Sequence, residues 1–394
     1  MDIVCLAFPA WKGNYLKSTV QLMSELAKNH RVLYVDYAYT WKDFAHSIRG
    51  KSFAEWQRMA GLESRLQEVN LDNGAALHVL TLPPVVPTNF IKNPKIYDVL
   101  NHFNAFFLEK TIKKALKTLD FKNYTMVNAF NPFYGVPLAG RLDEARLVYY
   151  CYDEIGAAHW AGQHGARLEK IFLQHVDSVI VSSQGLFEKK SKEHPHCHLV
   201  KNGVDYDLFA AQTPPSVSER LSQQFLVKIP KNAKIIGYLG SVDERLDYDL
   251  LENLIATTPQ YHYVFVGRIT RKEYENRLYA FPNVHLVGSQ PPQDLPAWVG
   301  LFDTCLIPFV KNDLTAGIYP LKINEYLAAG KPVVATPFAD LSDFASIITI
   351  ADSAASFAFS FEHHTSTAAE KAKRQIFAAQ NSWANKALTF ADKF

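Results

Sequence analysis

Cysteine, net charge and long apolar runs are all scarce in this chain of 394 residues. Its four cysteines show no Cys-x-x-Cys spacing, which argues against a disulfide framework and indicates buried, reduced thiols. The formal net charge is only +2, so no overall basic field points to nucleic acid as a partner. Because no apolar run reaches spanning length and no basic leader is present, we expect a cytoplasmic chain with neither a signal peptide nor a transmembrane helix.

Motifs for cofactors and metals are missing as well. A Gly-x-Gly-x-x-Gly fingerprint occurs nowhere, which argues against a dinucleotide enzyme. The run His194-Pro195-His196-Cys197-His198 is rich in metal-ligand side chains, but its spacing matches no structural zinc pattern and no second cluster follows. Asp-x-Asp triplets begin at Asp205 and Asp247, and each leads into a helix or turn that aspartate commonly caps. We therefore expect no metal and no cofactor.

The chain does contain the alternation of strands and helices that is typical of α/β domains. Its length fits two domains, and 48% hydrophobic with 20% charged residues is typical of a globular protein. Strand-like runs of the first half stand at residues 2–8, 31–37, 76–82, 124–130, 147–152 and 178–183. Residues 40–70 and 90–119 have helical patterns. The β-α-β opening predicts a parallel sheet.

Polar residues follow several of these strands, at the end where open parallel sheets bind ligands. The loop Lys12-Gly13-Asn14 follows the first strand, Asn128 and Asn131 mark the end of the fourth, and Asp153 follows the fifth. These residues are candidates to meet a ligand, and Asn128, Asn131 and Asp153 are the candidate catalytic residues. Asp153 could equally cap the next helix, and the sequence leaves that alternative open.

Aromatic and basic residues are mixed at residues 41–58 and 92–117. A basic helical face of this kind would suit the inner-membrane surface or an anionic lipid. A solvated helix face explains the same pattern, because charge runs usually just solvate. Both interpretations stay open from the sequence.

A second α/β series follows a loose segment at residues 210–232, whose Thr213-Pro214-Pro215-Ser216 is typical of an interdomain linker. Its strand-like runs begin at residues 235, 261, 284, 304 and 333. The predicted domains are therefore residues 1–210 and 211–375.

Residues 315–337 are predicted to form a loop, a short helix and a strand. Pro320 suits the first helical position, and Gly330 suits the position after the helix. At about 100° per residue, one helix face carries Ile323, Tyr326 and Leu327 and can pack on a sheet. The other face carries a mixed set: Leu321, Lys322, Glu325, Ala328 and Ala329. A helix N-terminus attracts phosphate, and the alanines would leave room for a ribose diol beside the carboxylate. An ordinary amphipathic helix with a solvated Glu325 is the alternative.

Four motifs in sequence order carry a family resemblance. They are Asn202-Gly203-Val204-Asp205, Gly237-Tyr238-Leu239-Gly240-Ser241, residues 283–288 (NVHLVG) and residues 320–335 (PLKINEYLAAGKPVVA). The chain thereby resembles the family 4 glycosyltransferases, in their bacterial cell-envelope and exopolysaccharide branch. The resemblance implies the GT-B fold, which has two Rossmann-like domains facing each other across a cleft. It also implies that a last helix, at about residues 376–394, crosses back to the first domain.

The resemblance implies a retaining, metal-independent hexosyltransferase that uses a UDP- or GDP-type nucleotide sugar. The donor would meet Gly240, Ser241, Arg245, Gly267, Arg268, Gly288, Gly317, Ile318, Tyr319, Leu321, Lys322 and Glu325. Glu325 would hold the ribose hydroxyls, and the loop Lys12-Gly13-Asn14 would face the donor phosphate and the acceptor. Asn128 or Asn131 would occupy the region of the family's reaction-centre histidine. The acceptor stays open between a glycan, a lipid-linked sugar and a small molecule.

The chain departs from the family pattern at three positions. Gly317 stands where a glutamate normally touches the donor sugar, and Ser241 and Asp247 stand where an arginine and a lysine usually meet the diphosphate. Three nearby cations could replace them: Arg245, Arg268 and Lys322. Two other functions stay open, a nucleotide-sugar epimerase of the same architecture and a degenerate protein that binds nucleotide sugar without turnover.

Overall fold

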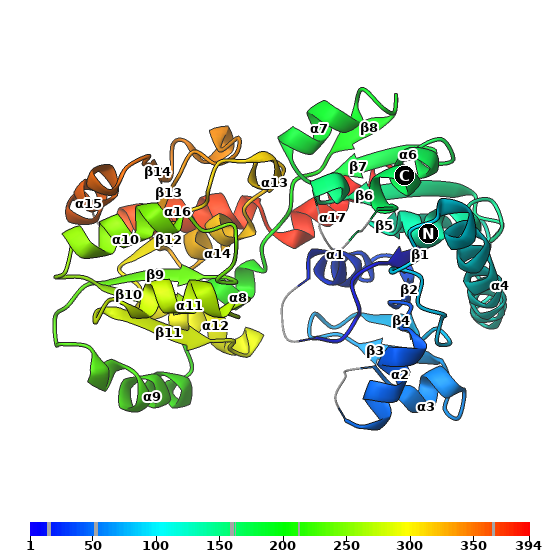
Figure 1. Ribbon diagram of the computed structural model, residues 1–394, viewed down its shortest axis with the longest axis horizontal. Helices are drawn as coiled ribbons and strands as arrows, with labels where there is room; N and C mark the ends of the chain where they lie inside the picture. The colour runs from blue at the N-terminus through cyan, green and yellow to red at the C-terminus, as the bar shows by residue number, and fades with distance from the viewer. Residues whose placement is uncertain (14–16, 51–53, 158–160, 162, 212, 365–366) are drawn as a thin grey trace. The chain divides into compact units, whose positions relative to one another are not determined.

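The computed structural model describes residues 1–394 except 14–16, 51–53, 158–160, 162, 212 and 365–366. The chain forms two compact units (Figure 1). Unit 1 comprises Met1–Lys201 and Ala384–Phe394, and unit 2 comprises Asn202–Trp383.

Both unit boundaries differ from the positions predicted from the sequence. The first falls before residue 210, because α8 (Tyr206–Ala210) packs against α14 (Leu321–Ala328) of unit 2. The second falls after residue 375, because α16 (Ala368–Gln380) also packs against α14. Only the segment from Ala384 onward returns to unit 1, where Phe390 contacts the ring of Tyr150 at a centroid distance of 5.1 Å.

The sheet of unit 1 has the strand order β3-β4-β2-β1-β5-β6-β7-β8. Its strands are β1 (Asp2–Ala7), β2 (Arg31–Val35), β3 (Leu66–Asn70), β4 (Ala76–Leu80), β5 (Thr125–Ala129), β6 (Arg146–Cys151), β7 (Ser178–Val181) and β8 (Cys197–Leu199). Neighbouring strands are parallel except β3 and β4, which are antiparallel. The winding reverses between β1 and β5, and open α/β sheets bind ligands at such a switch point.

The helices of unit 1 are α1 (Ser18–Leu26), α2 (Trp41–Ile48), α3 (Trp56–Ala60), α4 (Pro94–Thr118), α5 (Pro132–Leu138), α6 (Gly165–Phe172), α7 (Gln184–Lys190), the 3₁₀ turn η1 (Ile155–Ala157) and α17 (Trp383–Ala391), which begins at the last residue of unit 2. The helical prediction for residues 40–70 is wrong at its end, where β3 pairs with β4 as an edge strand. The residues of β3 have no strong strand preference of their own, so pairing with β4 decides their conformation.

The sheet of unit 2 has the order β11-β10-β9-β12-β13-β14, with all neighbours parallel. Its strands are β9 (Ile235–Leu239), β10 (His262–Val266), β11 (Val284–Gly288), β12 (Thr304–Ile307), β13 (Val333–Ala335) and β14 (Thr349–Ile350). Besides α8, α14 and α16, its helical elements are α9 (Pro215–Gln224), η3 (Leu226–Lys228), α10 (Tyr248–Thr257), α11 (Lys272–Tyr279), η4 (Pro292–Asp294), α12 (Leu295–Leu301), α13 (Asp313–Ala316), η5 (Ser342–Phe344) and α15 (Ala354–His363). Its switch point lies between β9 and β12.

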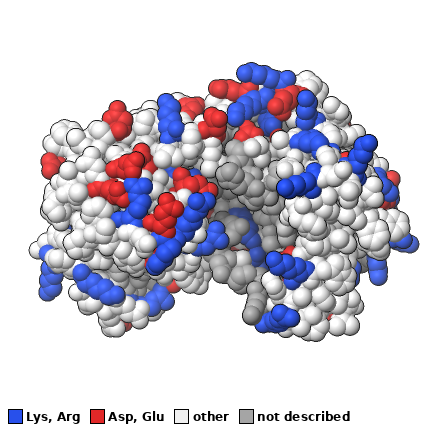
Figure 2. All heavy atoms as spheres, viewed as in Figure 1, with Lys and Arg blue, Asp and Glu red and all other residues white. Residues whose placement is uncertain are grey.

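The central strands of both sheets are buried throughout, as expected for parallel strands covered on both faces. Lys and Arg side chains are interspersed with Asp and Glu over much of the surface in view (Figure 2). Among the described residues, no helix combines the length and the apolar character that a membrane span requires.

Candidate functional site

Three predicted glycines meet at the carboxyl edge of the unit 2 sheet. Gly240 follows β9, and its N–H donates to Val266 O at 2.9 Å. Gly267 follows β10, and its N–H donates to Gly288 O, also at 2.9 Å. Gly267 has φ +154, and a Cβ there would lie 1.9 Å from Gly240 O. Only glycine fits this close approach of two loops, which lies beside the switch point.

Helix α14 begins next to this edge. Its start differs slightly from prediction, because Pro320 is the N-cap residue and Leu321 is the first helical residue. Gly330 follows the helix with φ +75, as predicted for a glycine terminator. The buried hydroxyl of Tyr326 accepts a hydrogen bond from Leu239 N at 2.7 Å. This contact ties α14 to the last residue of β9.

The carboxylate of Glu325 is buried rather than solvated, with 6% of the residue exposed. Lys322 Nζ lies 3.2 and 3.0 Å from its two oxygens. The predicted space beside it is smaller than expected, because Ala328 is fully buried and its carbonyl accepts from Gln375 Nε2 of α16 at 3.2 Å. An ionised carboxylate with one ammonium partner still has lone pairs for a diol.

The segment before α14 is more ordered than the predicted loop, because Asn312 caps the short helix α13 with a capping box. The N–H of Ile318 donates to Thr315 O at 3.0 Å, so this predicted phosphate contact is already used within the chain. The N–H groups of Tyr319 and Leu321 have no acceptor in the part of the chain that the structure describes. Gly317 is buried in a right-handed conformation at the end of α13.

The three replacement cations differ in their partners. Arg245 donates to both oxygens of Asp243, at 2.9 and 2.6 Å, so its charge is largely compensated. Lys322 pairs with Glu325. Arg268 is exposed and has no ion-pair partner among the described residues. Arg268 is therefore the cation most accessible to a ligand at this edge. Ser241, at the same loop, is half-buried, and its carbonyl accepts from the hydroxyl of Tyr238 at 3.1 Å.

The predicted asparagines of unit 1 bind backbone groups at the end of β5. Asn128 is fully buried, and its amide exchanges hydrogen bonds with Asn131 N and O at 2.9 and 3.0 Å. Asn131 also donates to Ala7 O at 3.4 Å and caps α5. The Asn131 side chain therefore joins the ends of β1 and β5 at the switch point of unit 1, and the Asn128 side chain fixes the turn that follows β5.

The predicted loop after β1 is partly described. Lys12 forms an ion pair with Glu55 at 2.7 Å. Gly13 lies against the ammonium of Lys17, which donates to Ala10 O and Lys12 O. Asn14 lies outside the described residues. The two lysines thus bind groups of unit 1 itself.

Asp36 is a buried carboxylate that the sequence analysis missed. It follows β2, and one of its oxygens accepts from Trp11 N at 2.7 Å and Tyr37 N at 2.8 Å. Burial raises the pKa of Asp36 to about 6. The rule that selected Asn128 and Asp153, a polar residue at a strand's carboxyl end, could have selected Asp36 too.

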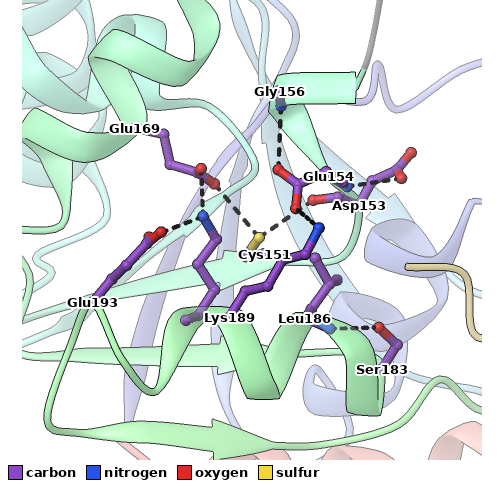
Figure 3. A network of polar contacts seen from close by, with 10 residues as sticks. Cys151, Asp153, Glu154, Gly156, Glu169, Ser183, Leu186, Lys189 and Glu193 are labelled. Carbon is purple, nitrogen blue, oxygen red and sulfur yellow. Dashed lines mark hydrogen bonds and ion pairs between the residues drawn. The ribbon is translucent and has the colours of Figure 1, made fainter. Parts of the chain in front are cut away.

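Asp153 lies beside a polar network at the carboxyl end of β6 (Figure 3). Its carboxylate accepts from Glu154 N at 2.9 Å, so it serves a local turn before η1. Behind it, Lys190 Nζ of α7 lies 2.6 Å from Glu169 of α6, and the hydroxyl of Tyr149 donates to Glu169 at 2.8 Å. Burial opposes the charged form of Lys190, but the adjacent carboxylate of Glu169 raises its pKa overall.

The histidine-rich run contributes to the fold of unit 1. A ring nitrogen of His194 contacts Val176 O at 3.1 Å, and Cys197 begins β8. Within the described residues, no group of three His, Cys, Asp or Glu side chains is placed to hold a metal ion. The Asp-x-Asp aspartates are caps, with Asp205 accepting from Leu208 N and Asp247 from Leu250 N.

Part of the chain is similar in sequence to known glycosyltransferases. Residues 233–361, within unit 2, match the family model described as Glycosyl transferases group 1. TuaH of Bacillus subtilis, named as a candidate teichuronic acid biosynthesis glycosyltransferase, is 28% identical over 221 residues. This match covers 52% of the present chain and 54% of TuaH, so the chain spans about half the length of this relative.

Solved structures match over nearly the whole chain. HepE of Anabaena in complex with UDP and glucose gives a TM-score of 0.66 at 15% identity, over 100% of this chain and 98% of HepE. Sucrose-phosphate synthase of Thermosynechococcus elongatus gives a TM-score of 0.71 at 14% identity, and the match covers 99% of this chain and 97% of the synthase. At such identities the likeness shows the fold alone. The chain therefore has the GT-B fold, and part of unit 2 is similar to a glycosyltransferase family, in agreement with the resemblance of the sequence to the family 4 glycosyltransferases.

Proposed function

We propose that this protein transfers a sugar from a nucleoside diphosphate sugar to an acceptor in cell-surface polysaccharide or glycolipid synthesis. The observation that carries the proposal is the convergence of the glycine loops and the start of α14 at the switch point of unit 2. The match of residues 233–361 to a glycosyltransferase family and the likeness to TuaH support it. HepE, which binds UDP and glucose in its crystal structure, supports a UDP-type donor.

The donor is proposed to bind along the carboxyl edge of unit 2. Glu325 would accept hydrogen bonds from the ribose hydroxyls, since its carboxylate is fixed by Lys322. The unpaired N–H groups of Tyr319 and Leu321 would donate to the diphosphate at the positive end of α14. Arg268 would supply the positive charge that Ser241 and Asp247 do not.

The proposed chemistry relies on stabilising the leaving diphosphate rather than on a protein nucleophile. Negative charge builds up on the leaving oxygen as the glycosidic bond breaks, and oriented N–H groups stabilise that charge without reorganising. We propose a hexose donor, retention at the anomeric carbon and no requirement for a metal ion. Activity should therefore persist in the presence of a chelator, and proton NMR of the product should show the donor's anomeric configuration.

The direct test is to screen UDP- and GDP-sugars for thermal stabilisation, since a ligand that binds the folded state raises the melting temperature. Free nucleotide and sugar transfer would then be followed by mass spectrometry with acceptor extracts. Release of nucleotide supports the proposal. Isomerisation of the donor would indicate an epimerase, and binding without turnover a degenerate protein. Absence of any nucleotide-sugar binding would overturn the proposal.

Replacing the proposed ribose ligand tests the site itself. Glu325→Ala should weaken donor binding by about 1–3 kcal/mol, the loss typical of hydrogen bonds to a charged group. Isothermal titration with the best donor measures the change. Glu273→Ala is the control, because Glu273 is an exposed glutamate on α11 of the same unit. Equal affinity for the Glu325 variant and the native protein would remove Glu325 from the site.

A further inference from the structure

Unit 1 contains a large apolar cavity of about 490 Å³ between α2, α3, α4 and the segment after β4. Its walls are mainly aromatic and aliphatic, with Trp41, Phe44, Met59, Val85, Phe103 and Phe107 among them. Three of these side chains also remain strongly exposed, Trp41 at 54%, Phe103 at 53% and Phe107 at 46%. A monomeric protein rarely leaves so much aromatic surface uncovered without a partner or ligand.

A second, smaller cavity of about 70 Å³ lies next to the first, since Val85 and Val86 line both. It extends to the ends of β1, β2 and β5, where Phe8, Tyr37 and Asn131 line it. This is the switch point of the unit 1 sheet, where a ligand of unit 1 is expected. The lining is more polar here, with amide and hydroxyl groups of Asn101, Asn131, Thr88 and Tyr134. The two cavities are thus neighbours, the larger one mainly apolar and the smaller one more polar.

The described lining of the apolar cavity has one charged residue, Arg65. Arg65 donates to the carbonyls of Arg58 and Met59 at 3.1 and 2.7 Å, with no carboxylate partner in the described part of the chain. Arg65 is half-buried, and this burial lowers the pKa of its guanidinium. A phosphate or phosphate ester is the natural counterion for such a group.

Helix α4 extends this surface with one apolar and basic face. Ile96, Val99, Phe103, Phe106 and Phe107 are exposed, and they are followed on the same face by Lys110, Lys114 and Lys117. Basic side chains lie over the region of unit 1 where Figure 1 places α4 (Figure 2). The two acids of α4 lie on another face, where Asp98 pairs with Arg167 and Glu109 with Arg141. Exposed aromatics beside lysines are typical of surfaces that contact anionic lipid.

We propose that the acceptor is an anionic, lipid-linked sugar whose hydrocarbon chain occupies the apolar cavity of unit 1. The polar end would reach the smaller cavity at the switch point, and the lysines of α4 would contact the anionic membrane that holds the lipid. This inference rests on the proposed function and selects one acceptor class for it. A soluble glycan fits less well, because it would leave the aromatic walls without an apolar partner.

The test uses dodecyl phosphate as a soluble probe, with inorganic phosphate as the control for the head group. Titration should show saturable binding of dodecyl phosphate and none of inorganic phosphate. Phe103→Asp should weaken this binding at least tenfold, because it places a charge at the cavity mouth. Phe359→Asp, at an exposed phenylalanine of unit 2, should leave the binding unchanged. Equal binding by all three proteins would overturn the inference.

Flotation with vesicles supplies a second readout that does not depend on the cavity variant. The protein should float with phosphatidylglycerol vesicles and less with phosphatidylcholine vesicles. Replacing Lys110, Lys114 and Lys117 together by alanine should abolish the difference, because these exposed side chains carry charge but no core contacts. Concentration-dependent dimerisation that Phe103→Asp abolishes, without amphiphile binding, would assign the face to a second copy and overturn the inference. UDP-sugar binding by the native protein is measured in parallel. If the protein binds dodecyl phosphate but no UDP-sugar, the result counts against the proposed function and not against the lipid site.

Discussion

Asp36 is a buried carboxylate whose pKa is raised by its burial. Its carboxylate lies at the end of β2 with two backbone N–H donors on the same oxygen, yet burial still raises its pKa to about 6. The folded chain therefore holds this proton more tightly than the unfolded chain, whose aspartate titrates near 3.9. The contribution of Asp36 to the free energy of unfolding is complete below about pH 4 and is lost as the pH rises through about 6.

Asp36→Asn should remove this pH dependence. Asparagine keeps an oxygen for both N–H donors, so the main change is the loss of the buried charge. Relative to the native protein, the variant should gain up to about 3 kcal/mol of unfolding free energy between about pH 4 and pH 7, at 1.36 kcal/mol per pKa unit. Urea denaturation across this range measures the gain. Asp72→Asn, at an exposed turn aspartate, is the control, and a constant difference between native protein and Asp36→Asn would contradict the assignment.

For single residues, the sequence predicted where the site residues lie better than it predicted which groups they contact. The glycines at 240, 267 and 288 were predictable, because loops after parallel strands recur at the ligand edge. The partners of polar side chains were not, since they depend on residues far apart in the chain. Arg245 is paired with Asp243 and Ile318 N with Thr315 O, and no periodicity reveals either contact. Glu325 stays the proposed ribose ligand, now with a fixed geometry.

Among the elements, α6 and α7 are joined to β6 by a buried ion pair. Lys190 and Glu169 are each only 5% exposed at the side chain, and Tyr149 donates to the same carboxylate. Removing one partner of a buried pair leaves the other charge uncompensated, which costs more than the pair itself contributes. The pair therefore makes the α6–β6–α7 packing sensitive to single substitutions.

Lys190→Met should lower the free energy of unfolding by about 3–5 kcal/mol, because Glu169 would keep a buried charge. Its neighbour supplies a matched control, since Lys189 forms an exposed pair with Glu154 and has 53% of its side chain in solvent. Lys189→Met should cost about 1 kcal/mol or less. Thermal and urea unfolding of the two variants give the comparison. Similar losses for both would show that the Lys190 pair has no special energetic role.

Element types were largely predictable where strands are buried on both faces, because such strands form unbroken apolar runs. The failures lie where tertiary pairing overrides local preference. Strand β3 is half-exposed and polar, so its sequence does not favour a strand over a helix. Its pairing with β4 determines its conformation. The space predicted beside the alanines of α14 is a second example. Helix α16 packs there and Ala328 is buried, and the sequence alone does not reveal this contact.

For the whole molecule, both sheets wind in the same order around their switch points. β4-β2-β1-β5-β6-β7 in unit 1 corresponds to β11-β10-β9-β12-β13-β14 in unit 2. Each unit thus has its own candidate ligand edge, next to the smaller cavity in unit 1 and at the glycine loops in unit 2. The fold class was predictable from the alternation of elements, whereas the proposed division of ligands between the units rests on the side chains that surround each edge.

Addition of UDP should protect backbone amides mainly in unit 2. Hydrogen–deuterium exchange should slow at residues 317–325 and at the loops that contain Gly240 and Gly267, because a bound ligand suppresses local opening. Residues 178–190 of unit 1 serve as the internal control and should exchange at an unchanged rate. Protection confined to unit 1 would contradict the proposed division of ligands.

The return of Ala384–Phe394 to unit 1 has a consequence for biosynthesis. A nascent chain that has reached Lys201 already contains both sheet edges of unit 1 but lacks Phe390, whose ring covers Tyr150. Domains generally fold as they emerge from the ribosome, N-terminal first. We therefore expect the core of unit 1 to be complete only after all of unit 2 has been translated.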